Sequence, residues 1–156
     1  MRVGIGYDIH ALRKGRKLIL GGISVPFSKG LVGHSDADVV LHSVIDAVLG
    51  ALALGDIGDH FPDHEPRYKG KSSVFFVEKI KALLKKRRLK IAHIDTTIIA
   101  QAPKLSGHKQ KIKRKIAEVF MVPLERVGVK AKTNEGFGLV GKNQAIACFS
   151  IVSLTR

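Results

Sequence analysis

Asp8 and His10 are the first side chains in this sequence whose types and spacing suit metal chemistry. They follow the apolar run Val3-Gly4-Ile5-Gly6, which is typical of a β-strand, where alternate residues point to the same face. A carboxylate and an imidazole would then lie side by side, as ligands of a divalent transition metal do. Asp-x-His also occurs by chance in many chains, and the alternative is that Asp8 only caps a turn.

His42 is the expected third ligand. Asp38, His42 and Asp46 recur every four residues in a helical pattern and would line one face of a helix. His42 lies between Val39-Val40-Leu41 and Val44-Ile45, and a buried ionisable side chain needs a partner or a metal. One carboxylate and two imidazoles suit zinc and leave a fourth position for water or substrate, as in catalytic sites.

The elements that must position these residues follow from hydrophobic periodicity and from helix-capping signals. We expect strands at residues 2–8, 17–25, 91–100, 127–132 and 145–154. We expect helices from Ser35 or Asp36 to about Leu54, from Ser72 or Ser73 to about Arg88, and from Lys104 or Lys109 to Phe120. Residues 30–35 are a predicted loop, 56–66 a polar loop of the kind that carries function, and 133–144 a glycine-rich turn.

Strands and helices therefore mix without strict alternation, which predicts an α+β fold: a single domain over residues 1–156, with a mixed β-sheet and helices packed on one face. The other sheet face must be buried too, and self-association into a closed ring would bury it.

Cys148, the only cysteine, is expected to be a buried, inert thiol. No apolar run reaches the roughly 18 residues of a membrane span, and no leader precedes the first strand, so we expect a cytoplasmic protein.

The net charge of +14 predicts anionic partners. Residues 79–90 and 104–115 are rich in Lys and Arg but keep apolar residues at helical spacing, so we interpret both as solvated helix faces. Neither stretch contains an aromatic residue for base stacking, which makes nucleic-acid binding the less favoured interpretation. A Lys-rich, heat-adapted surface is a third explanation of the charge.

Several short stretches carry unusual residue combinations in a definite order. They are Gly4-Ile5-Gly6-Tyr7-Asp8-Ile9-His10, Gly33-His34-Ser35-Asp36-Ala37-Asp38-Val39, Gly55-Asp56-Ile57-Gly58, Phe61-Pro62-Asp63, residues 95–105 and residues 130–135. In this order and at these separations, over nearly the whole chain, they resemble the 2-C-methyl-D-erythritol 2,4-cyclodiphosphate synthase family of the non-mevalonate isoprenoid route.

The resemblance implies a homotrimer with active sites between neighbouring subunits, each with a zinc ion held by Asp8, His10 and His42. The substrate would be 4-diphosphocytidyl-2-C-methyl-D-erythritol 2-phosphate. Its 2-phosphate would attack the β-phosphorus, close a cyclic diphosphate and expel CMP. Such a transfer needs positive charge and placement more than acid–base chemistry.

The resemblance also assigns roles around the phosphates. Zinc would act as a Lewis acid, and a second ion, magnesium or manganese, would sit on the diphosphate with Glu135 as its protein ligand. His34 and Thr133 would be the catalytic residues, because they would donate hydrogen bonds to oxygens on which charge develops.

Substrate binding is implied for two pockets besides Asp8, His10 and His34. The erythritol pocket would comprise Ser35, Asp56, Ile57, Gly58, Phe61, Pro62, Asp63, His64 and Glu65. The cytidine pocket would comprise Ala100, Gln101, Ala102, Pro103, Lys104, Leu105 and Ser106, with Lys104 near the phosphates. Further contacts would come from Lys132, Thr133, Asn134, Glu135, Leu139 and Lys142. Without the resemblance, Asp56 and Asp63 read as ordinary turn residues.

The chain departs from the family pattern near its C-terminal loop. Lys132-Thr133-Asn134-Glu135 replaces a common Thr-Thr-Thr-Glu, Leu139 a usual Phe, Lys142 a usual Arg, and Asn143-Gln144-Ala145 a usual Gly-Glu-Gly. Some family members bind isoprenoid diphosphates on the trimer axis near these positions, and Lys does not replace Arg at a bidentate phosphate contact.

Two rival functions are a metal-dependent phosphohydrolase, which would use the same ligands to activate water, and a basic nucleic-acid-binding module.

Overall fold

The computed structural model describes all residues, 1–156, and has one mixed five-stranded sheet with the order β4-β1-β7-β5-β6. The strands are β1 (Arg2–Lys14), β4 (Lys29–Leu31), β5 (Lys90–Ile99), β6 (Val127–Lys132) and β7 (Ala145–Thr155). Every neighbouring pair is antiparallel except β5 and β6, which are parallel. The predicted single-domain α+β fold with a mixed sheet is confirmed.

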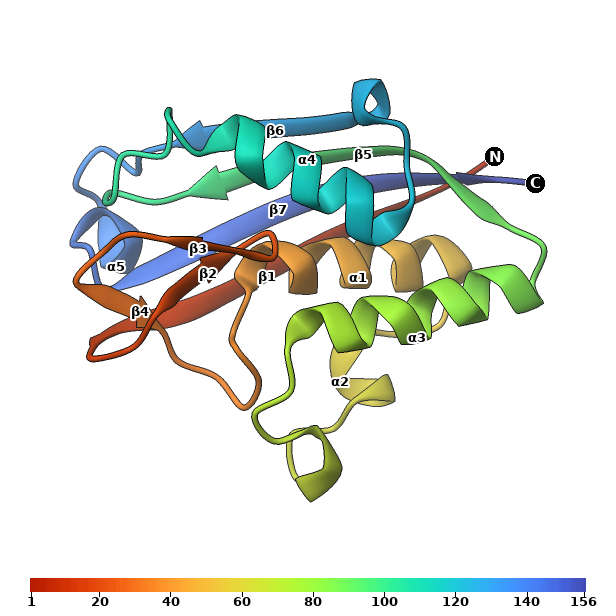
Figure 1. The fold of residues 1–156 in the computed structure, drawn as a ribbon, viewed down its shortest axis with the longest axis horizontal. Helices are drawn as coiled ribbons and strands as arrows, with labels where there is room; N and C mark the ends of the chain where they lie inside the picture. The colour runs from red at the N-terminus through yellow and green to blue at the C-terminus, as the bar shows by residue number, and fades with distance from the viewer.

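Three long helices cover one face of this sheet (Figure 1). Helix α1 (Val39–Leu52) packs on β1 and β7, α4 (Lys109–Phe120) packs on β6, and α3 (Ser73–Lys86) lies against α1 and α4. Almost every α1 side chain is buried because the helix is enclosed between the sheet and α3. None of the helices is long and apolar enough to cross a membrane.

Two glycines of β1 allow α1 to lie directly against the sheet. A Cβ on Gly4 would come within 2.0 Å of the Ala47 carbonyl oxygen, and one on Gly6 within 2.0 Å of the Ser43 carbonyl oxygen. Real Cβ atoms do not approach backbone so closely, so any side chain here would push the helix away. The distance between β1 and α1, which carry the predicted metal ligands, therefore depends on these glycines.

The opposite sheet face is apolar and exposed. Val3, Ile5 and Tyr7 of β1 and Phe149 and Ile151 of β7 have exposed fractions between 42% and 68%. Ile5 pairs with Ile151 and Tyr7 with Phe149 across the two strands, so these side chains form one continuous patch. Such a contiguous patch is typical of an interaction surface.

Several predicted boundaries were wrong. The first strand runs to Lys14, residues 17–25 form the hairpin β2 (Leu18–Leu20) and β3 (Ile23–Val25), and residues 29–31 are a strand. The predicted polar loop 56–66 contains α2 (Ile57–His60) and ends where η1 (Pro66–Tyr68) begins, and the predicted glycine-rich turn contains α5 (Gly138–Gly141). The 3-10 helix η2 (Leu124–Arg126) precedes β6. Short elements of this kind carry too few residues for a periodic signal.

The start of α1 was also misplaced, because Asp38 is its N-cap instead of Ser35 or Asp36. The Asp38 carboxylate accepts hydrogen bonds from the amides of Val40 and Leu41 and from those of Gly21 and Gly22 in the β2–β3 turn. Asp38 therefore anchors the helix to a distant hairpin and does not share a functional face with His42.

Candidate metal centre and active site

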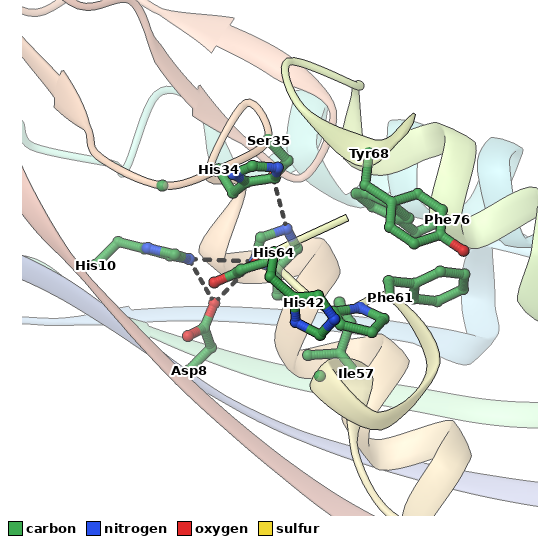
Figure 2. Close-up of a pocket in the computed structure, with 14 residues that line it drawn as sticks. Asp8, His10, His34, Ser35, His42, Ile57, Phe61, His64, Tyr68 and Phe76 are labelled. Carbon is green, nitrogen blue, oxygen red and sulfur yellow. Dashed lines mark hydrogen bonds and ion pairs between the residues drawn. The ribbon is translucent and has the colours of Figure 1, made fainter. Parts of the chain in front are cut away.

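Asp8 and His10 of β1 meet His42 of α1 at the edge of a cavity (Figure 2). The Asp8 Oδ2 atom lies 2.9 Å from His10 Nε2 and 3.1 Å from His42 Nδ1, and the two ring nitrogens are 3.1 Å apart. One ligand atom from each side chain lies within 4.8 Å of the other two. The predicted convergence of these three residues is confirmed, and the donor set fits a divalent metal.

The electrostatics of the cluster keep Asp8 ionised. Burial alone would raise its pKa, but hydrogen bonds and positive charge from His10 and His42 lower the pKa far below its ordinary value. Burial would lower the pKa of His10, whereas the hydrogen bond and charge of Asp8 raise it. A carboxylate that stays charged at any physiological pH is what a metal ligand requires.

The ring of His10 has its tautomer set by the backbone. Its Nδ1 lies 2.9 Å from the carbonyl oxygen of Val32, which can only accept a hydrogen bond. Nδ1 must therefore carry a proton, so Nε2, which faces Asp8 and His42, is the nitrogen that a bound metal would take. This is the usual way in which proteins orient a metal-binding imidazole.

The cavity beside the triad has a volume of about 510 Å³. Of the residues expected in the erythritol pocket, it is lined by Ser35, Ile57, Gly58, Phe61, Pro62, Asp63 and His64, and the predicted catalytic residue His34 lines it too. Nε2 of His34 is buried without a hydrogen-bond partner, so it is free to donate to a bound ligand. Tyr68 and Phe76 also line the cavity. Sequence reasoning missed both: Phe76 lies in a helical pattern, where an aromatic residue looks like any core residue, and Tyr68 lies in η1, which is too short for a periodic signal.

Asp56 and Glu65 do not line this cavity. Asp56 is the N-cap of α2 and accepts a hydrogen bond from the Asp59 amide, while Glu65 pairs with Arg67 at 2.7 Å. Both carboxylates thus have local partners, as the turn interpretation of Asp56 predicts.

A second cavity of about 400 Å³ lies at the carboxyl ends of the parallel strands β5 and β6. Among the predicted residues it is lined by Ala100, Gln101, Pro103, Lys104, Leu105, Ser106, Lys132 and Thr133, together with the unpredicted Lys109 and Ala131. Ala102 does not line it. The two cavities share no residue, so the residues of the two expected pockets lie apart within one chain.

The remaining predicted residues lie in the segment that follows β6. The Thr133 hydroxyl donates a hydrogen bond to the Glu135 carboxylate, and Asn134 donates one to the carbonyl oxygen of Phe137. Leu139 lines a third cavity, whereas Lys142 is exposed and Glu135 lines neither of the first two cavities. These residues therefore lie outside the metal cavity of their own chain.

Comparison with known proteins gives the same family from sequence and from structure. The model of the YgbB family matches residues 1–155. A relative from Alkaliphilus metalliredigens named 2-C-methyl-D-erythritol 2,4-cyclodiphosphate synthase is 52% identical over 154 residues, covering 99% of this chain and 97% of its own. A solved structure of such a synthase has a TM-score of 0.91 at 34% identity, covering 99% of this chain and 100% of its own. A CDP-bound form has a TM-score of 0.91 at 33% identity with the same coverage.

The fold and the triad together define a single-domain α+β protein with a candidate divalent-metal centre. The family match extends over nearly the whole chain. The chain therefore belongs to the family of 2-C-methyl-D-erythritol 2,4-cyclodiphosphate synthases.

Proposed function

We propose that this chain converts 4-diphosphocytidyl-2-C-methyl-D-erythritol 2-phosphate to 2-C-methyl-D-erythritol 2,4-cyclodiphosphate and CMP, and is thus a phosphorus–oxygen lyase. An oxygen of the 2-phosphate forms a bond to the β-phosphorus, and the bond from that phosphorus to the oxygen of CMP breaks. The observation that carries the proposal is the meeting of Asp8, His10 and His42 at a cavity wall in a member of this family.

In this proposal, different residues bind the metal, donate hydrogen bonds to the phosphates and supply positive charge. Asp8, His10 and His42 hold a divalent ion, proposed to be zinc, which supplies Lewis-acid charge when bound. His34 donates from its unpartnered Nε2 to a phosphoryl oxygen, and Thr133 donates to another. Lys104 and Lys132 add positive charge at the second cavity.

Glu135 completes the proposed set by holding magnesium or manganese on the diphosphate. Its carboxylate is exposed and accepts a hydrogen bond only from the hydroxyl of Thr133. Lone pairs on the carboxylate oxygens therefore remain for binding a hard cation. The pyrimidine would be bound by backbone groups of residues 100–106.

We further propose a homotrimer in which the first cavity of one subunit faces the second cavity of its neighbour. Two observations support this assembly. The sheet face opposite the helices is an exposed apolar patch, and the half-sites for the two ends of the substrate share no residue in one chain. A cytoplasmic location completes the proposal, in keeping with one buried, unpaired cysteine.

The decisive experiment incubates the purified protein with the proposed substrate and magnesium, with and without a chelator, and follows the products by phosphorus NMR. We expect CMP and a cyclic diphosphate signal, both lost on chelation. Linear phosphate products would favour the metal-dependent hydrolase instead. No turnover by the metal-loaded protein, together with salt-dependent binding to nucleic acid that His42→Ala leaves unchanged, would favour the basic binding module.

A further inference from the structure

His42 has a buried environment on the side of its ring that faces away from Asp8. Its Nδ1 is directed at Asp8 and His10, whereas its Nε2 lies 2.9 Å from the hydroxyl of Ser73 and 3.2 Å from that of Ser35. Ser73 is fully buried at the first turn of α3, which packs on α1. Figure 2 shows the contact between Ser35 and His42.

Ser73 is in turn held by a carboxylate. Its hydroxyl and its backbone amide both donate to Asp36, the amide at 3.0 Å, so the two groups form a bidentate contact. A serine hydroxyl has one proton to donate and two lone pairs with which to accept. With its proton directed at Asp36, the Ser73 oxygen can only accept a hydrogen bond from His42.

We propose that Asp36 and Ser73 are positioning residues that hold a proton on Nε2 of His42, so that Nδ1 is the nitrogen that this ring offers to a bound metal. An unprotonated Nε2 would place two lone pairs against each other at 2.9 Å in a buried site. The inference rests on the proposed metal site. It explains why His10 and His42, held by a carbonyl and by a serine, offer different ring nitrogens to one centre.

Ser35 is the competing partner for Nε2, but its hydroxyl is less well placed. Its oxygen is farther away, at 3.2 Å, and already accepts a hydrogen bond from the Ala37 amide. Its proton is not committed to a carboxylate, so Ser35 could donate to or accept from the imidazole. Only Ser73 has the direction of its hydrogen bond fixed, and so only Ser73 requires the proton on Nε2.

The test combines zinc affinity, measured by competition with a chromophoric chelator, with ¹⁵N NMR of the His42 ring. In Ser73→Ala we expect zinc affinity to fall by about 10- to 100-fold, the usual effect of losing such a partner. In wild type the ¹⁵N signal of Nε2 should be of the protonated type with and without zinc, and in Ser73→Ala without zinc it should move toward the unprotonated value, because Asp8 favours a proton on Nδ1. Ser73→Thr, which keeps the hydroxyl, should restore both readouts.

Ser72→Ala is the matched control, because Ser72 caps the same helix but does not contact His42. It should lower thermal stability and leave zinc affinity and the ring signals unchanged. The proposal is overturned if Ser73→Ala keeps wild-type affinity and signals, or if only Ser35→Ala changes them. A wild-type protein that binds no zinc would instead contradict the proposed function, while the ring signals would still report the tautomer.

Discussion

At the scale of single residues, the candidate metal centre consists of side chains that are buried or half-buried and already have hydrogen-bond partners. Asp8 and His10 are held in place by each other and by Val32, and His42 by contacts on both ring nitrogens. A cluster organised in this way before a metal arrives loses little entropy on binding one.

His42→Ala tests the contribution of the third ligand. We expect bound zinc to be lost and turnover to fall by at least about 100-fold, because a Lewis acid supplies several kcal/mol of stabilisation to the developing charge. Metal content by atomic emission and turnover by CMP release measure this, and circular dichroism should show that the fold persists. His93→Ala, at an exposed histidine on β5, is the control and should behave like wild type. A fully active His42→Ala variant would remove His42 from the site.

Cys148 gives a second prediction at this scale. Burial raises the pKa of its thiol to about 12, so the folded protein should not react with Ellman's reagent near neutral pH, whereas the denatured chain should react fully. Since the folded pKa lies above the unfolded value of about 9, this thiol favours folding below pH 9. That contribution should be lost as the pH rises toward 12. Fast labelling of native protein, or equal pH slopes of stability for wild type and Cys148→Ala, would contradict this.

At the scale of elements, the site depends on how closely α1 approaches β1. The contact is backbone against backbone at Gly4 and Gly6, and it sets the distance from Asp8 to His42. A metal centre tolerates little error in that distance, because ligand bond lengths are fixed within a few tenths of an ångström.

Gly6→Ala should therefore affect both folding and metal binding. We expect a loss of about 1–3 kcal/mol in the free energy of unfolding, as is usual for overpacking, together with weaker zinc binding, measured by urea denaturation and by chelator competition. Gly50→Ala in α1 is the matched control, because its Cβ would meet the nearest atom at an ordinary 3.5 Å. It should bind zinc normally and gain up to about 1 kcal/mol from helix propensity. Equal effects of the two variants would contradict the close-packing argument.

At the scale of the whole molecule, the helical side and the sheet side have opposite characters. Lysine-rich faces of α3 and α4 carry much of the +14 charge, while β1 and β7 expose the apolar patch. The charge keeps the helical side in water, and the apolar patch favours burial between subunits.

Ile5→Glu tests the assembly. Ile5 is 68% exposed in the single chain, so a glutamate there should fold but should not pack into a subunit interface, where a buried unpaired charge costs several kcal/mol. Light scattering should give a trimer for wild type and a monomer for the variant, with loss of turnover. Met121→Glu adds the same charge at an exposed apolar residue that ends α4, and it should stay trimeric and active. A monomeric wild type, or an active Ile5→Glu monomer, would contradict the shared active site.

The sequence by itself determined those features of the secondary structure that depend on residues close together along the chain. Strand alternation predicted that Asp8 and His10 share one face, and helical periodicity predicted the central parts of helices α3 and α4. The strand 127–132 was predicted with its correct bounds. These features are local, because each is set by residues within a few positions along the chain.

Only the tertiary structure decided which distant groups meet. The hydrogen bonds of Asp38 to the Gly21–Gly22 turn, the lining of the cavity by Tyr68 and Phe76, and the contact of Ser73 with His42 join segments far apart in the chain. The separation of the predicted substrate residues into two cavities likewise follows from the sheet order, which puts β1 and β6 at different places in the sheet. Such contacts depend on side-chain packing across elements, and local periodicity carries no information about it.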